Sequence, residues 1–186
     1  MFGGTFDPPH IGHLVAAIDA HRALDLDIVL LVVANVPWQK VDSRRISTAE
    51  DRLALVRAAV EDVPFLQVSD LEIRRGGDSY TADTLVELAH DEPDAQLFVI
   101  LGNDAAVGFR TWDRYEEVAA GSTLVVVDRP GTPTPVDPDF DWVRVEIPEL
   151  EVSSTELRTR VADGRSIRYL TPDRVASVIA DRSLYL

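Results

Sequence analysis

Apolar residues along the chain gather in short continuous runs that are separated by amphipathic stretches. The clearest run covers residues 28–34, and two similar runs cover residues 97–101 and 123–127. Short runs rich in β-branched residues are typical of strands that are buried on both faces. Residues 65–68 and 142–147 are weaker strand candidates, and the second of them alternates apolar with charged positions.

Helical patterns lie between these runs. Residues 13–24 and 81–89 have helical spacing, and Ser47-Thr48-Ala49-Glu50 matches a capping box that predicts a helix through Val60. Two more helices are expected, one from Ser153 or Ser154 to about Asp163 with Gly164 as its stop, and one from Thr171-Pro172-Asp173 to about Ala180. This alternation predicts an α/β fold in which helices cover a parallel sheet.

Two segments stand apart from this pattern. Such a sheet needs a strand that leads into the first glycine turn, yet only Met1-Phe2 precede Gly3. Either the start is truncated or misassigned, or the central strand is unusually short. The prolines within residues 129–138 predict an extended surface loop.

Composition fits an ordinary globular protein. Of its residues, 46% are hydrophobic and 27% are charged. The length of 186 residues predicts a single domain over residues 1–186. The lack of cysteine excludes disulfides, thiolate nucleophiles and cysteine zinc sites. The longest apolar run is too short to span a bilayer, and no export signal is visible. We therefore expect a cytoplasmic protein with no membrane partner.

The net charge of −14 limits which macromolecules are expected to bind. A chain this acidic repels nucleic acid unless it carries a local basic stripe, and none is present in the sequence, so we expect no nucleic-acid partner. Arginine dominates the cations, and Lys40 is the only lysine. The sequence leaves the oligomeric state open, and a homo-oligomer is compatible with it.

The segment Gly-Gly-Thr-Phe-Asp-Pro-Pro-His-Ile-Gly-His, residues 3–13, combines several features of a phosphate site. Its glycines let the backbone approach a ligand closely. His10 and His13 lie three residues apart at the opening of a helix, whose N-terminus attracts phosphate. Their imidazoles add hydrogen-bond donors. The alternatives are a zinc site, which lacks further ligands, or a pair of capping or core histidines.

This segment resembles the signature of the nicotinate mononucleotide adenylyltransferases, within the nucleotidyltransferases that carry an HxGH motif. The resemblance implies a Rossmann-like three-layer αβα fold with a mainly parallel sheet. It also implies that ATP and nicotinate mononucleotide react directly in line to give deamido-NAD and pyrophosphate, a step of NAD biosynthesis, with Mg²⁺ accompanying ATP. His10 and His13 would be catalytic, and Gly3, Gly4, Thr5, Phe6 and Gly12 would bind ATP.

Two further segments resemble phosphate-binding motifs of the family. Residues 35–40, Asn-Val-Pro-Trp-Gln-Lys, stand where many relatives have Pro-Pro-His-Lys, so Lys40 keeps a catalytic lysine while Trp38-Gln39 depart from the pattern. Residues 152–158 resemble Ile-Ser-Ser-Thr-x-Ile-Arg, which implies that Arg158 is catalytic. The hydroxyl residues Ser153, Ser154 and Thr155 would bind ATP at a helix start. The plainer alternatives are a solvated lysine and a simple serine cap.

The remaining motif residues concern the two nucleosides. Gly102 and Asp104 follow a predicted strand, where relatives show Gly-x-Asp, and are expected to bind the adenosine side of ATP. Residues 77–81 resemble the family's Pro-Ser-Tyr-Thr segment, with Asp78 in place of proline, and Thr111-Trp112 resemble its tryptophan element. The resemblance implies that nicotinate mononucleotide binds through an aromatic platform and nearby backbone amides, at Ser79, Tyr80, Thr81, Trp112 and Asp113. The alternatives are helix capping by Asp104 or by the Tyr80-Thr81 pair and core packing by Trp112.

No metal ligands are expected among the protein side chains, because no full ligand set is recognisable. Three rival functions stay open. The nearest is another HxGH nucleotidyltransferase, such as one acting on phosphopantetheine, which does not explain residues 79–81 together with Trp112. The second is a non-catalytic nucleotide-binding regulator, and the third is a fragment of a class I aminoacyl-tRNA synthetase.

Overall fold

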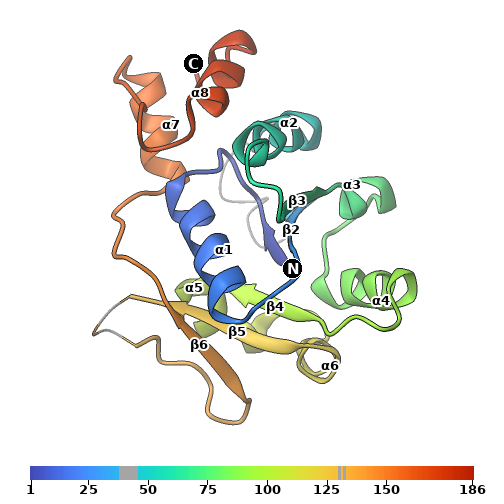
Figure 1. The fold of residues 1–186 in the computed structure, drawn as a ribbon. Helices are drawn as coiled ribbons and strands as arrows, with labels where there is room; N and C mark the ends of the chain where they lie inside the picture. Colours follow the sequence, from blue (N-terminus) through green and yellow to red (C-terminus); the bar gives the residue numbers. More distant parts are fainter. Residues whose placement is uncertain (38–45, 130, 132) are drawn as a thin grey trace.

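The computed structural model describes residues 1–37, 46–129, 131 and 133–186. Its strands are β1 (Phe2–Gly4), β2 (Val29–Val33), β3 (Leu66–Ser69), β4 (Phe98–Leu101), β5 (Thr123–Asp128) and β6 (Trp142–Glu146). Its helices are α1 (Ile11–Ala23), α2 (Ala49–Val60), α3 (Leu71–Arg75), α4 (Thr81–Asp91), α5 (Asn103–Val107), the 3-10 helix η1 (Phe109–Thr111), α6 (Tyr115–Gly121), α7 (Ser154–Ala162) and α8 (Asp173–Asp181). Their arrangement is shown in Figure 1.

The strands pair in parallel as two groups, β1-β2-β3 and β4-β5-β6. Met1 links the groups, because its amine donates to the carbonyl of Phe98 and its carbonyl accepts from the N–H of Ile100 at 2.9 Å. These two bonds follow the pattern of a parallel pair. The strands therefore run in the order β3-β2-β1-β4-β5-β6, and the chain changes direction across the sheet between β1 and β4. Ligands bind at such a switch point, beyond the carboxyl ends of the strands.

Helices cover both faces of the sheet. Ile100 and Val125 point to one face and pack in a core that contains residues of α1, α2, α7 and α8. Their neighbours Val99 and Val126 point to the other face and pack with residues of α4, α5 and α6. This alternation follows from the two-residue period of a strand. It confirms the predicted three-layer α/β fold with a mainly parallel sheet.

The glycine segment begins inside a strand, which differs from the prediction of a turn. Gly3 and Gly4 lie in β1, where they pair with Val32 and Val33. The strand has only three residues, which matches the expectation of an unusually short central strand. Its pairing extends through Met1 to β4, so its short length still spans the centre of the sheet.

Two predicted helix caps were wrong by one residue. The N-cap of α2 is Thr48, not Ser47, and its hydroxyl accepts a bond from the N–H of Asp51 at 3.1 Å. α8 begins at Asp173, because the hydroxyl of Thr171 donates instead to the carbonyl of Pro9 at 2.8 Å. The sequence also did not predict α3, α5 and α6, which are short. In contrast, Ser153 caps α7 as expected.

The proline-rich segment was expected to lie on the surface, and its described part does so only partly. Thr134 is buried, and its N–H donates to the buried carboxylate of Asp128 at 2.8 Å, while Val136 is partly buried against the core. That carboxylate also pairs with Arg144 of β6, which ties the segment to the sheet. In the described ranges of the chain, no helix combines the length and the apolar character needed to cross a membrane.

Candidate active site

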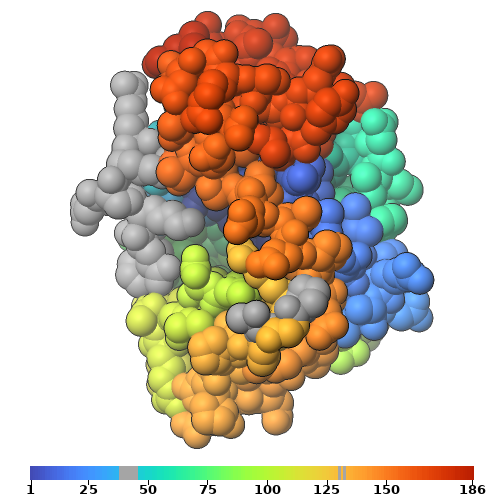
Figure 2. Space-filling view, turned by 90° about the vertical axis from the view of Figure 1, so that its left-hand side faces the viewer, coloured from blue at the N-terminus to red at the C-terminus, as the bar shows by residue number. Residues whose placement is uncertain are grey.

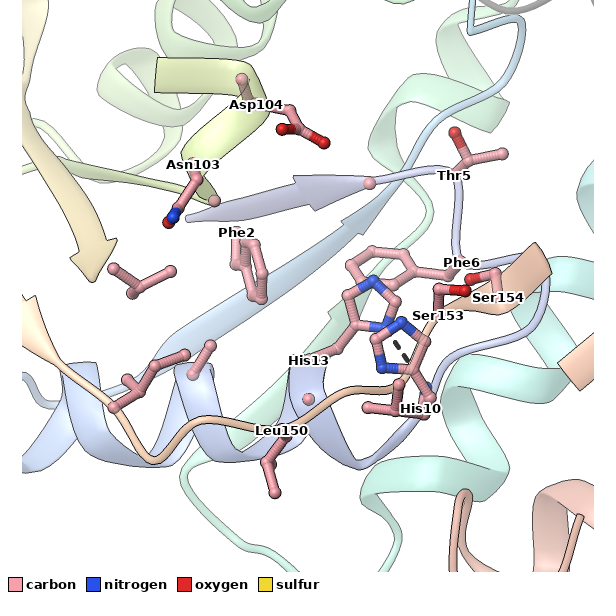
Figure 3. A pocket seen from close by; sticks show the side chains of 18 of the residues that line it. Phe2, Thr5, Phe6, His10, His13, Asn103, Asp104, Leu150, Ser153 and Ser154 are labelled. Carbon is pink, nitrogen blue, oxygen red and sulfur yellow. Dashed lines mark hydrogen bonds between the residues drawn. The ribbon is translucent and has the colours of Figure 1, made fainter. Parts of the chain in front are cut away.

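The two histidines of the HxGH segment meet at the N-terminus of α1. His10 is the N-cap and His13 is the third residue of the helix, and the N–H of His10 donates to Nδ1 of His13 at 3.2 Å. The two imidazoles stack with ring centroids 3.7 Å apart. Figure 3 shows them face to face beside Phe6. Because Nδ1 of His13 accepts this bond, the proton of the neutral ring is on Nε2, which makes Nε2 its donor atom.

Burial determines the charge of the His10 ring. His10 is buried, and this burial lowers its pKa to about 4, so its imidazole is neutral at pH 7. A neutral ring next to His13 avoids the repulsion that two stacked imidazolium cations would have. The site can therefore offer imidazole donors to an anion without a second buried charge.

Two glycines here lie close to neighbouring rings. A Cβ at Gly12 would lie 3.1 Å from the ring of His10, and one at Gly4 would lie 2.8 Å from the ring of Phe6. Phe6 itself takes a left-handed φ of 50° and is buried, so the chain turns sharply after β1. The ring of Phe6 then packs edge-on against His13, with centroids 5.1 Å apart. These contacts fix the histidine pair.

The N-terminus of α7 lies beside the histidines. Ser154 donates its hydroxyl proton to the carbonyl of Pro8 at 2.8 Å, which holds the β1–α1 loop. Ser153 accepts from the N–H of Glu156 at 3.1 Å, and Thr155 accepts from Arg158 Nη2 at 3.0 Å. Since these two hydroxyls accept, each keeps its own proton for donation to a ligand. The motif predicts one role for all three hydroxyls, and the structure separates them.

Arg158 bridges α7 and the β1–α1 loop. Its Nη1 donates to the carbonyl of Asp7 at 2.8 Å. The guanidinium lines the same cavity as the two histidines, so a fixed cation faces that space.

These elements surround a cavity of about 790 Å³ at the carboxyl end of β1. Asn103 and Asp104 at the start of α5 approach it from the opposite side of β1 in Figure 3. Figure 2 shows the face where the surface is hollowed between the orange C-terminal segment and the yellow-green segment around residue 105. Every described residue that is predicted to be catalytic or to bind ATP lines this cavity: Gly3, Gly4, Thr5, Phe6, His10, Gly12, His13, Gly102, Asp104, Ser153, Ser154, Thr155 and Arg158.

A second, smaller pocket of about 190 Å³ adjoins it. The five residues expected to bind the mononucleotide all line this pocket: Ser79, Tyr80, Thr81, Trp112 and Asp113. Residues 3–5 and Ala105 line both spaces, so the two pockets share a wall. Helix α4 begins at this pocket, and none of the described side chains caps its N-terminus. Its first amides are therefore suited to an anionic group.

Lys40 and Trp38-Gln39 lie outside the described residues, so their expected role stays a prediction from sequence. Within the described ranges, no group of three or more histidine, aspartate or glutamate side chains is placed to hold a metal ion.

Sequence reasoning missed three residues that shape the site. Arg52 of α2 is buried and donates to the carbonyls of Thr5 at 3.1 Å and Ala34 at 2.6 Å. Its position three residues before Leu55, on the apolar face of the helix, could have marked it. Tyr185 donates to the carboxylate of Asp7 at 2.8 Å, and Glu72 is buried in the wall of the smaller pocket. No pattern in the sequence marks either of these two.

Comparison with known proteins decides the family. The family described as Cytidylyltransferase-like matches residues 1–160. A protein of Exiguobacterium sibiricum named "Probable nicotinate-nucleotide adenylyltransferase" is 43% identical over 185 residues, which cover 100% of this chain and 97% of that protein. A Streptomyces coelicolor protein of the same name is 44% identical and covers 98% of both chains. This chain belongs to the nicotinate-nucleotide adenylyltransferase family.

A solved structure agrees with the fold of this adenylyltransferase family. The nicotinic acid mononucleotide adenylyltransferase of Plasmodium falciparum, complexed with NaAD, superposes with a TM-score of 0.80. The match covers 99% of this chain and 95% of that one, at 18% sequence identity. The predicted membership of the family, and with it a nucleotidyltransferase enzyme, is confirmed.

Proposed function

We propose that this chain transfers the adenylyl group of ATP to nicotinate mononucleotide, which gives nicotinate adenine dinucleotide and pyrophosphate for NAD biosynthesis. An oxygen of the mononucleotide phosphate attacks the α-phosphorus of ATP in line. One P–O bond forms and the bond to the pyrophosphate leaving group breaks. The observation that carries the proposal is the wall that the two pockets share, because it brings a triphosphate site and an aromatic pocket together at one strand end.

The larger cavity suits the triphosphate. Imidazoles of His10 and His13, the start of α7 and the guanidinium of Arg158 supply donors of fixed direction along one side of it. Charge builds up on phosphate oxygens as pyrophosphate leaves, and preorganised donors stabilise that charge. We also assign Lys40 to this group on the sequence motif alone. Gly102 and Asp104, beyond β4, would hold the adenosine side.

The smaller pocket suits the nicotinate ring. Trp112 and Tyr80 provide aromatic surface for a flat ring, and the N-terminus of α4 provides amides for its carboxylate. Magnesium would be held by phosphate oxygens of ATP and would offset part of their charge. The residues around the larger cavity would supply hydrogen-bond donors to the same triphosphate.

A pyrophosphate-release assay with ATP and Mg²⁺ tests the proposal. We expect turnover with nicotinate mononucleotide, and it is compared with nicotinamide mononucleotide and phosphopantetheine as alternative acceptors. Turnover with phosphopantetheine alone would contradict the substrate assignment. Tight ATP binding without turnover of any acceptor would favour a nucleotide-binding regulator instead.

A further inference from the structure

Glu72 is an acidic residue where an anionic ligand is expected. It belongs to α3 and is 5% exposed, and it lines the same pocket as Trp112 and Tyr80. Buried carboxyl groups are retained when hydrogen bonds compensate the loss of water. The partners of Glu72 therefore indicate why the chain keeps it there.

A hydroxyl group of α4 donates to the Glu72 carboxyl group: Thr84 Oγ1 lies 2.7 Å from Glu72 Oε1. Burial raises the pKa of Glu72, and the side chains of Ser79 and Thr84 and the charge of Arg75 oppose that rise. The carboxyl group of α3 is thus bonded to the start of α4.

Thr84 has further contacts around the start of α4. Its Oγ1 accepts from Arg75 Nη2 at 3.1 Å and lies 3.3 Å from the carbonyl of Tyr80. On the other side of Tyr80, Ser79 Oγ accepts from the N–H of Asn35 at 2.8 Å, and the N–H of Ser79 donates to the carbonyl of Val36 at 3.0 Å. The bond between Glu72 and Thr84 therefore anchors the start of α4 from the side of α3.

We propose that Glu72 is a positioning residue for nicotinate mononucleotide: through Thr84 it fixes residues 80–81 and the first turn of α4, which receive the pyridine ring. The inference rests on the proposed function, since it concerns the same pocket. Glu72 does not touch the triphosphate cavity. Its loss should thus weaken binding of the mononucleotide and leave binding of ATP unchanged.

Glu72→Gln tests this with little change in volume. A glutamine replaces the carboxylate that accepts from Thr84 with a neutral amide, which weakens or loses this bond. We expect KM for nicotinate mononucleotide to rise about tenfold, in line with the loss of one buried hydrogen bond, while KM for ATP and kcat stay within about twofold. A general packing defect would move both KM values together.

Three other variants sharpen the test. Thr84→Val removes the hydroxyl at constant shape and should show the same selective rise, which keeps the inference falsifiable if Glu72→Gln does not fold. Thr84→Ser keeps the hydroxyl and should restore nearly normal KM. Glu92→Gln is the matched charge control, because Glu92 is exposed at the far end of α4. It should leave both KM values unchanged.

The outcomes separate the two proposals. Normal turnover of the unaltered enzyme with an unchanged mononucleotide KM in Glu72→Gln and Thr84→Val would overturn the positioning role alone. An equal rise of both KM values would overturn it as well. An unaltered enzyme that does not turn over nicotinate mononucleotide would overturn the proposed function, and the positioning role with it.

Discussion

At the scale of residues, the two histidines differ in what surrounds them. His10 is buried and neutral, with its pKa lowered to about 4 by burial. His13 is partly exposed to the cavity, and its Nδ1 is occupied by the N–H of His10. In our assignment, His13 is therefore the imidazole whose donor can follow the charge that develops on the leaving pyrophosphate.

His13→Ala should lower kcat by about a hundredfold, because it removes a donor that acts mainly on the transition state. The pyrophosphate-release assay measures this, and circular dichroism checks that the fold is kept. His90→Ala is the control, since His90 is exposed near the end of α4. A His13→Ala enzyme with nearly normal kcat would remove the residue from the mechanism.

The sequence predicted which residues of the motifs gather, but not what each does in the folded chain. Glycine, histidine and serine at fixed spacing match a phosphate site by their local pattern alone. The different duties of Ser153 and Ser154 have no such pattern, because the partner of Ser154 is the carbonyl of Pro8, which is 146 residues away in the chain. The hydrogen-bond partner of such a hydroxyl is determined by tertiary packing.

At the scale of elements, strands and long helices were the predictable part. Apolar runs identified β2, β4 and β5 almost to the residue because these strands are buried on both faces. Five-residue helices such as α3 and α5 have too few turns to show a period. Helix starts shifted where a side chain had a better partner elsewhere, as Thr171 does with Pro9.

Helix α2 stabilises the carboxyl ends of β1 and β2 through one side chain. Arg52 is 1% exposed, and its guanidinium donates to carbonyls from three separate segments: Ser47, Thr5, Ala34 and Asn35. A planar guanidinium can donate hydrogen bonds in all of these directions at once, whereas an ammonium group cannot. Arg52 thus joins the site loop to the helix layer.

Arg52→Lys should lower the free energy of unfolding by about 3 kcal/mol, because buried carbonyls lose their donors. Urea denaturation followed by circular dichroism measures the change. Arg57→Lys on the same helix is the control, since the side chain of Arg57 is 62% exposed and lies 3.6 Å from Asp70. Equal, small effects of the two substitutions would show that the carbonyl contacts of Arg52 contribute little.

At the scale of the whole molecule, the C-terminal segment packs against the loop that follows β1. α7 and α8 stand beside the N-terminal end of α1 in Figure 1. α8 is followed by Arg182, which pairs with Asp51 of α2 at 2.7 Å, and then by Tyr185. The hydroxyl of Tyr185 reaches Asp7 in the β1–α1 loop. The last turns of the chain therefore support the loop that carries His10.

Tyr185→Phe tests this closure. Burial and the nearby Asp7 carboxylate raise the pKa of Tyr185, so its hydroxyl stays protonated and donates to a carboxylate that is itself 1% exposed. Removing that donor should cost about 1 kcal/mol of stability. It should also raise amide hydrogen exchange in residues 5–10, measured by mass spectrometry. Tyr169→Phe, at a tyrosine that is 79% exposed, should change neither quantity. Unchanged exchange in residues 5–10 of Tyr185→Phe would mean that Arg158 and Ser154 hold the loop without help from the C-terminal segment.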